Sequence, residues 1–286
     1  MFEIGPFGIH TFGLMMAAGF FGAHFIIRRD YIRKGIHPDL AASIVFGAAV
    51  GGIVGAKLYH FVMGGFDWQS LFSGVGFTWY GGLTGGAVAV VWVVKNSKLL
   101  QETDPERRLA SPLDSIGLAL PLGQAFGRVG CFLSGDGDYG PPTDAPWAMS
   151  FAKGVVPSVV DGVELHVHPT PLYDIVLLLI GFSALMALRK RLDAAPGAMT
   201  GLAMIVMAAE RFITEFWRLT DVFSFKATPM GWESRSLADI YYGRAFDGTL
   251  LIDGISEYQL WSLLLMAAGA VVLWRSFRKN AQKRTD

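Results

Sequence analysis

The stretch AASIVFGAAVGGIVGAKLYHFVM, residues 41–63, contains a single side chain that is charged at neutral pH, Lys57. The hydrocarbon core of a bilayer is roughly 30 Å thick, and an α-helix of about 20 apolar residues crosses it. This stretch is long enough and apolar enough to do so. It therefore predicts a transmembrane helix, and the rest of the chain can be interpreted outward from it.

The composition of the whole chain favours lipid as its main solvent. Of the 286 residues, 52% are hydrophobic and only 17% are charged, whereas soluble domains carry about 25% charged residues. Lys plus Arg and Asp plus Glu number 24 each, so no basic excess indicates nucleic-acid binding. The single cysteine, Cys131, excludes an intrachain disulfide and a zinc site built from cysteines.

Six further stretches resemble the first in length and hydropathy. Together they predict an all-α integral membrane protein with seven transmembrane helices in a single membrane-embedded domain, residues 1–286. No basic segment precedes the first span, which favours a retained helix over a cleaved signal peptide. The predicted spans are residues 10–27, 41–63, 77–94, 116–133, 171–188, 198–217 and 258–274.

Lysine and arginine are concentrated in alternate connections, and such positive connections face the cytoplasm. We therefore expect the N-terminus outside and the C-terminus in the cytoplasm. The long connections 134–170 and 218–257 then form two caps on the outer face. The basic residues behind this orientation are Arg28, Arg29, Arg33, Lys34, Lys95, Lys98, Arg107, Arg108, Arg189, Lys190, Arg191, Arg275, Arg278, Lys279, Lys283 and Arg284.

Charged side chains in the sixth span are the most informative feature of the sequence, because such groups in a membrane cost on the order of a few kcal/mol unless paired or hydrated. Arg211, Glu215 and Arg218 follow one another at helical spacing and would share one helix face. One carboxylate does not neutralise two guanidiniums, which leaves a positive charge for an anion. An internal ion-pair network is the alternative interpretation.

Arg128 lies near the end of the fourth span, between Gly127 and Gly130. A guanidinium stays charged in any environment and binds phosphate through two parallel hydrogen bonds. The adjacent glycines let a bulky headgroup approach the backbone. Arg128 and Arg211, from different helices, therefore predict a clamp for a lipid phosphodiester. A structural arginine that extends to the membrane surface is the alternative.

The remaining patterns favour packing. His166 and His168 provide too few ligands for a metal site, and we expect neither a metal nor another cofactor. Cys131, in an apolar setting, is expected to pack rather than act as a nucleophile. Small residues at four-residue spacing predict close contact between helices; they are Gly47, Gly51, Gly55, Gly81, Gly85, Gly123 and Gly127.

Several of these segments together resemble the bacterial prolipoprotein diacylglyceryl transferases over nearly the whole chain. Residues 211–218, RFITEFWR, follow the family's Arg-Phe-x-x-Glu-x-x-Arg. Residues 127–140 resemble its Gly-Arg-x-Gly-Asn-Phe-x-Asn-Gly-Glu signature, and residues 168–174, HPTPLYD, resemble its His-Pro-Ser-Gln-Leu-Tyr-Glu. Residues 80–85, YGGLTG, stand where the family has His-Gly-Gly-Leu-Ile-Gly.

The resemblance implies transfer of a diacylglyceryl group from phosphatidylglycerol to the lipobox cysteine of an exported preprolipoprotein, in the bacterial inner membrane, with a thioether as product. The implied partners are phosphatidylglycerol, the signal peptide that carries the lipobox, and membrane lipids, but no nucleic acid. The implied catalytic candidates are Tyr80, Arg211, Glu215 and Asp136, and the substrate-binding candidates are Arg128, Arg211, Gly81, Gly82, Gly127, Gly130 and Arg218.

The chain departs from the family at several polar positions. Tyr80 replaces the family's histidine, Cys131 and Ser134 replace asparagines, and Phe12 replaces a tyrosine. Loss of these groups beside retained arginines leaves open a paralogue that binds phosphatidylglycerol with a different acceptor or without catalysis. A lipid or solute transporter is the third possibility, although transporters usually show an internal repeat, which this sequence lacks.

Overall fold

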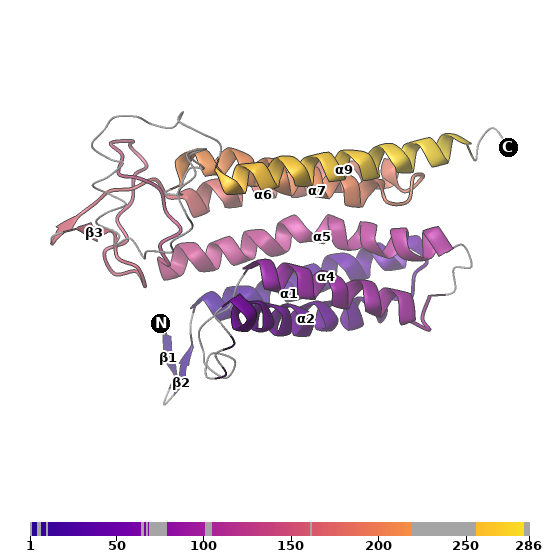
Figure 1. Cartoon of the computed structure of the whole chain (residues 1–286), viewed down its shortest axis with the longest axis horizontal. Helices are drawn as coiled ribbons and strands as arrows, with labels where there is room; N and C mark the ends of the chain where they lie inside the picture. The colour runs from indigo at the N-terminus through magenta and orange to yellow at the C-terminus, as the bar shows by residue number, and fades with distance from the viewer. Residues whose placement is uncertain are drawn as a thin grey trace. The chain divides into compact units, whose positions relative to one another are not determined.

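The computed structural model describes residues 2–4, 7–9, 11–63, 66, 68, 79–100, 105–160, 162–218 and 256–282, and these are overwhelmingly helical (Figure 1). Every predicted span overlaps one long helix, and the all-helical prediction is confirmed. The helices are α1 (Thr11–Lys34), α2 (Leu40–Met63), α4 (Trp79–Asn96), α5 (Pro105–Ser134), α6 (Thr170–Leu192), α7 (Ala198–Thr214) and α9 (Glu257–Gln282), with a 3-10 turn, η1 (Glu215–Trp217).

Five of these helices, α1, α2, α5, α6 and α9, are long and apolar enough to cross a membrane. The helix α7 has only 17 residues. The described residues are therefore those of a multi-pass membrane protein. The number of seven spans and the orientation of the two termini stay predictions.

Two short antiparallel hairpins accompany the helices, and neither was predicted. One pairs β1 (Phe2–Ile4) with β2 (Phe7–Ile9), and the other pairs β3 (Val159–Val160) with β4 (Val163–Glu164). Strands of two or three residues are too short to show the alternation of apolar and polar residues that predicts a strand.

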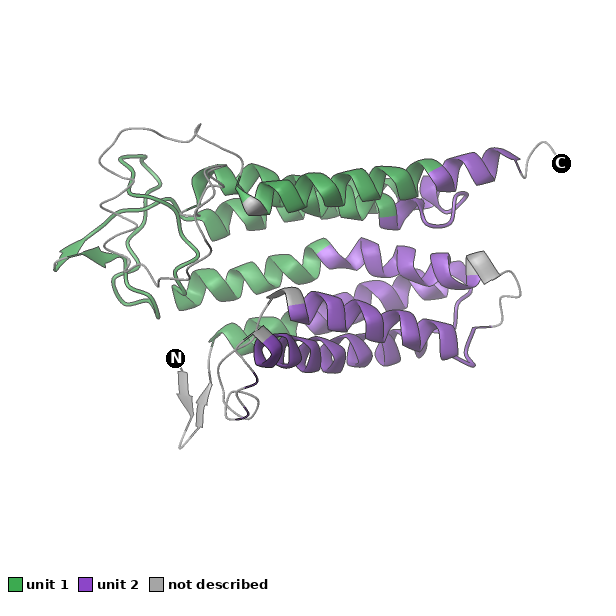
Figure 2. Ribbon diagram, in the orientation of Figure 1, with its two compact units in different colours: residues 1–19, 121–188, 201–274 green, residues 20–120, 189–200, 275–286 purple. Residues whose placement is uncertain are grey.

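The chain divides into two compact units (Figure 2). The first comprises residues 1–19, 121–188 and 201–274, and the second comprises residues 20–120, 189–200 and 275–286. Several helices run from one unit into the other. All the side chains of the candidate site described below, except those on α4, belong to the first unit.

Two helices extend beyond the predicted apolar spans. The helix α1 continues to Lys34 because Asp30, which is buried, accepts ion pairs from Arg33 at 2.7 Å and from Lys34 at 3.0 Å. Arg33 also pairs with Asp193. The helix α5 begins at Pro105, which suits the first position of a helix because no partner is needed there for the missing N–H. Hydropathy marks the apolar part of a helix, not its ends.

In the second unit, α2 and α4 pack through glycines, as their spacing predicted. A Cβ atom placed on Gly51 would lie 2.6 Å from the carbonyl oxygen of Gly85, and one on Gly55 would collide with the carbonyl oxygen of Gly81. Backbones this close leave no space for a side chain. The interpretation of these glycines as packing residues is confirmed.

The start of α7 is fixed by a buried carboxylate of α5. Asp114 accepts hydrogen bonds from the backbone N–H groups of Gly197 and Thr200, both at 2.8 Å, and from the Thr200 hydroxyl at 2.8 Å. The first N–H groups of a helix have no partner within it, and a negative charge there also opposes the helix dipole. Asp114 thus determines where the helix that carries Arg211 begins.

In the first unit, residues 135–169 form a folded cap at the ends of α5 and α6 (Figure 1). Its small core contains the buried side chains of Tyr139 and Val167, and the Tyr139 ring stacks on Phe151 at 5.1 Å. This segment coincides with the first predicted cap, 134–170, whose place on the outer face stays a prediction. The second, 218–257, lies almost entirely outside the described residues.

Candidate functional site

Four charged side chains form one closed set of ion pairs in the first unit. Arg128 of α5 pairs with Asp138 and, through Nε at 3.1 Å, with Asp174 of α6. Arg218, which directly follows η1, pairs with the same two carboxylates. The side chain of Asp174 is fully buried and that of Arg218 is only 6% exposed. We call these four residues the ion-pair square.

Asp138 reaches the square from the cap, and backbone contacts hold it there. The hydroxyl of Thr170, the first residue of α6, donates to the Asp138 carbonyl at 2.5 Å. Two residues further on, the N–H of Gly140 donates to the His168 carbonyl at 2.8 Å. A Cβ on Gly140 would collide with the carbonyl oxygen of Trp217. Glycine is therefore required where the cap meets the end of η1.

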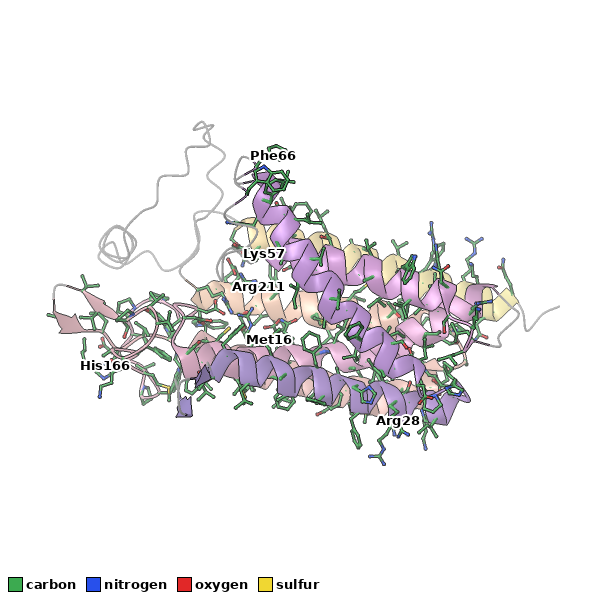
Figure 3. The ribbon with its side chains drawn as sticks, turned by 90° about the horizontal axis from the view of Figure 1, so that it is seen from below. Met16, Arg28, Lys57, Phe66, His166 and Arg211 are labelled. Atoms are coloured by element: carbon green, nitrogen blue, oxygen red, sulfur yellow. The ribbon has the colours of Figure 1, made fainter. Side chains whose placement is uncertain are left out.

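Arg211 and Glu215 form a second ion pair, with Nη2 and Oε2 2.9 Å apart. The Ser256 hydroxyl, just before α9, donates to Oε1 of Glu215 at 2.9 Å, and the Arg211 guanidinium lies 4.6 Å from the centre of the Tyr258 ring. Figure 3 labels Arg211 near the end of α7. Its Nη1 is buried and has no hydrogen-bond partner among the described residues, so Arg211 keeps a donor for another group.

Glu210 connects these two sets. It interacts electrostatically with both Arg128 and Arg211, and the amide of Gln124 on α5 donates to its Oε2 at 3.3 Å. Glu210 is only 3% exposed. Arg128 of α5 and Arg211 of α7 thus both interact with one carboxylate, and their action as a clamp stays a prediction.

The prediction that Arg211, Glu215 and Arg218 share one helix face is wrong for Arg218 alone, since Arg211 and Glu215 do pair at helical spacing. The α-helix ends at Thr214, and the 3-10 turn η1 redirects the chain before Arg218. Arg218 therefore points to Asp138 and Asp174, two carboxylates distant in sequence. For Arg218, the alternative interpretation of an internal ion-pair network describes the structure better.

Two further polar candidates lie beside the square. The thiol of Cys131 interacts electrostatically with both Arg128 and Asp136. The Asp136 carboxylate also accepts the backbone N–H of Asp138 at 3.3 Å. Asp136, a predicted catalytic candidate, therefore shapes the turn that delivers Asp138, and its catalytic role stays a prediction.

The glycines predicted to bind substrate face neighbouring helices. A Cβ on Gly130 would lie 3.0 Å from the Phe12 ring of α1, and one on Gly127 would lie 3.8 Å from Sδ of Met16. Gly81 and Gly82 pack on α2. A Cβ on Gly82 would lie 3.6 Å from the carbonyl oxygen of Gly52. Contact with a headgroup stays a prediction for all four.

Tyr80, the remaining catalytic candidate, belongs to the first turn of α4 in the second unit. Its side chain lies outside the described part of the structure. Its proximity to the arginines therefore stays a prediction.

His168 has a structural partner in the cap. Its Nδ1 lies 3.0 Å from the Tyr173 hydroxyl, which also accepts a hydrogen bond from the Trp147 indole at 2.7 Å. Burial lowers the pKa of His168 below its ordinary value, so the neutral ring is favoured. His166 lies further out on the cap, away from Arg211 (Figure 3). Among the described residues, no group of three or more His, Cys, Asp or Glu side chains could hold a metal ion.

Sequence reasoning missed three carboxylates of the site, Asp138, Asp174 and Glu210. Asp174 and Glu210 both lie in predicted spans or at their ends, where any ionisable residue is a functional candidate. That signal was sufficient to select them. Asp138 gave no such signal, because it is one of several aspartates in an irregular loop.

Fold and site together define a multi-pass helical membrane protein with arginines and carboxylates buried next to a folded cap. The family model described as prolipoprotein diacylglyceryl transferase matches residues 1–275. The chain belongs to this family, and it is a diacylglyceryl transferase of lipoprotein biosynthesis.

Individual relatives agree with the family match. A protein of Chromohalobacter salexigens, named phosphatidylglycerol–prolipoprotein diacylglyceryl transferase, is 32% identical over 76% of this chain and 78% of its own length. Its namesake from Nitratidesulfovibrio vulgaris is 32% identical over 77% and 80%. That from Aeromonas salmonicida is 25% identical over 97% and 90%. The resemblance found in the sequence motifs is thereby confirmed.

Proposed function

We propose that this protein transfers the diacylglyceryl group of phosphatidylglycerol to the thiol of a lipobox cysteine in an exported preprolipoprotein. The relatives' names give phosphatidylglycerol and prolipoprotein as their substrates. Sulfur forms a bond to the glycerol carbon while the C–O bond to phosphate breaks. The product is a thioether, and glycerol phosphate leaves with the bonding electron pair.

The arrangement of Arg128 and Arg211 around Glu210 is the observation that carries this proposal. The lipid phosphate is an anion, and its charge increases as the C–O bond breaks. Fixed guanidiniums stabilise such charge without reorganising. Nη1 of Arg211 has no hydrogen-bond partner among the described residues, so it would be able to donate to the lipid phosphate. The ion-pair square holds Arg128 in position.

We further propose seven spans in the bacterial inner membrane, with the N-terminus outside and both caps on the outer face. Exported preproteins arrive at that face, so their cysteine would meet the lipid headgroup next to the cap. The fold supports this placement because the cap, Arg128 and Arg218 all lie at one end of the helices that carry them.

Complementation tests the function directly. The gene is expressed in bacteria depleted of their own transferase, and a lipoprotein is weighed by mass spectrometry. We expect the mass of one added diacylglyceryl group. Arg128→Ala should abolish transfer, and Arg211→Lys should reduce it at least about tenfold, because an ammonium lacks the planar fork.

Asp144→Asn serves as the matched control, because Asp144 is exposed on the cap. Its transfer should equal that of the wild type. Full transfer by Arg128→Ala would remove the clamp from the mechanism.

A paralogue without this activity is the second candidate, favoured by the departures at Tyr80 and Cys131. The double variant Tyr80→His, Cys131→Asn restores two family residues. If the wild type transfers weakly, the double variant should transfer faster. Absence of transfer by both proteins would favour the paralogue.

A further inference from the structure

The start of α9 contacts both members of the Arg211–Glu215 ion pair. The Ser256 hydroxyl, just before the helix, donates to Oε1 of Glu215 at 2.9 Å. The Tyr258 ring lies with its centre 4.6 Å from the Arg211 guanidinium. Ser256 and Glu215 are both buried, so water does not compete for their hydrogen bond. All four residues belong to the first unit.

The direction of the Ser256 hydroxyl is fixed by a capping box. The backbone N–H of Gln259 donates to Oγ of Ser256 at 3.1 Å, and Oε1 of the Gln259 side chain accepts the backbone N–H of Ser256 at 3.1 Å. This reciprocal pair is a known way of closing the N-terminus of a helix. A hydroxyl has a single hydrogen. Because the oxygen of Ser256 accepts from Gln259, its hydrogen is available for Glu215.

The helices α7 and α9 also touch at a second place, far from this contact. A Cβ atom on Gly201 would lie 2.7 Å from the carbonyl oxygen of Gly269, and one on Gly269 would lie 2.7 Å from that of Gly201. From these glycines to Glu215 and to Ser256, the two chains rise by roughly 20 Å each. The helices are therefore antiparallel and held together at two separate places, so the start of α9 keeps its position relative to Arg211.

Two contacts restrict the orientation of the Arg211 guanidinium. Its Nη2 lies 2.9 Å from Oε2 of Glu215, the carboxylate that Ser256 holds through the other oxygen. The Tyr258 ring attracts the same guanidinium through its π-system. Nη1 is buried and has no hydrogen-bond partner among the described residues. The ion pair and the ring thus leave Nη1 as the donor for a bound anion.

We propose that Ser256 and Tyr258 are positioning residues for Arg211, which present its Nη1 to the phosphate of phosphatidylglycerol. Ser256 acts through Glu215, and Tyr258 acts on the guanidinium directly. The inference rests on the function proposed above. A donor that is already oriented when the lipid arrives stabilises the phosphate without a cost of reorganisation.

Binding of phosphatidylglycerol to the full chain tests the inference without requiring transfer. The lipid is titrated into detergent-purified protein, and the complexes are counted by mass spectrometry of the intact assembly. Ser256→Ala should weaken binding about three- to tenfold, because Glu215 loses a donor and no longer holds Arg211 in one orientation. Ser256→Thr keeps both the hydroxyl and the cap, and should bind like the wild type.

Ser262→Ala is the matched control for Ser256→Ala. Ser262 is a buried serine of the same helix, and its hydroxyl donates to the carbonyl oxygen of Tyr258 at 2.8 Å, within the helix itself. The variant should bind phosphatidylglycerol like the wild type. Equal binding by Ser256→Ala and the wild type, or an equal loss in Ser262→Ala, overturns the positioning role of Ser256.

The ring of Tyr258 is tested by two variants of one position. Tyr258→Phe keeps the ring and should bind like the wild type, whereas Tyr258→Leu should weaken binding about three- to tenfold. Tyr258 is 40% exposed, so both variants are expected to fold, also if Ser256→Ala does not. Wild-type binding by Tyr258→Leu, or an equal loss in Tyr258→Phe, overturns the role of the ring.

A double variant separates positioning of Arg211 from a general loss of stability. Arg211→Lys weakens binding by itself, and the addition of Ser256→Ala should weaken it no further, because no guanidinium is left to orient. Losses that multiply in the double variant would mean that the two residues act independently. That result overturns the inference.

Transfer to a lipobox peptide then separates this inference from the proposed function. Ser256→Ala should transfer lipid more slowly with an unchanged KM for the peptide. If the wild type transfers lipid but the losses in binding multiply, the inference alone fails. If binding shows the expected coupling and the wild type transfers no lipid, the proposed function fails while the positioning stands. A wild type that does not bind phosphatidylglycerol overturns both.

Discussion

Asp138 is the residue on which two arginines depend at once. Its two oxygens pair with Arg128 and with Arg218, and 23% of its side chain is exposed. A surface ion pair between single partners contributes little to stability, because water screens it. Here one carboxylate joins a helix, the cap and the end of η1, so its loss affects three segments.

Asp138→Asn keeps the size of the side chain and removes its charge. Arg128 and Arg218 would then keep Asp174 as their one shared ion-pair partner among the described residues, which leaves a poorly compensated buried charge. We expect the free energy of unfolding to fall by about 3 kcal/mol, measured by thermal unfolding in detergent, and transfer to fall with it. Asp144→Asn in the exposed part of the cap should change neither quantity. Unchanged stability of Asp138→Asn would contradict the bridging role.

At the scale of the helices, glycine spacing decides how closely α2 and α4 approach. A Cβ on Gly55 would meet the Gly81 carbonyl and would lie 2.8 Å from Cα of Gly85. Both neighbours are backbone atoms, which cannot move aside without separating the helices.

Gly55→Ala should therefore destabilise the protein by about 1–3 kcal/mol, as expected for overpacking. Gly13→Ala is the control, because a Cβ at Gly13 in α1 meets nothing within 4 Å. Thermal unfolding in the same detergent compares them. Equal melting temperatures for Gly55→Ala and the wild type would mean that α2 and α4 are not held by this contact.

The same scale shows what sequence can predict. Helix positions and the glycine contacts follow from local periodicity, and hydropathy located every long helix. The ion-pair square could not be predicted in this way, because its members are separated by up to 90 positions along the chain, from Arg128 to Arg218. The 3-10 turn at Glu215 was not predicted either, because the spacing of the charged residues was taken to be helical as far as Arg218.

For the whole molecule, the proposed topology makes a direct prediction about access. On a Cys131→Ser background, Val155→Cys places a thiol on the cap, and Lys98→Cys places one between α4 and α5. Both positions are exposed. A membrane-impermeant maleimide should label Val155→Cys in intact spheroplasts and Lys98→Cys only after lysis. The reverse pattern would invert the topology.

The ion-pair square also determines when during synthesis the site can exist. Arg128, Asp138 and Asp174 leave the ribosome well before Arg218. Until that last guanidinium arrives, two acidic side chains share one basic partner within a half-inserted chain. Chains truncated between α6 and η1 should consequently be degraded by membrane proteases, because the final arginine completes the charge balance of the ion-pair square.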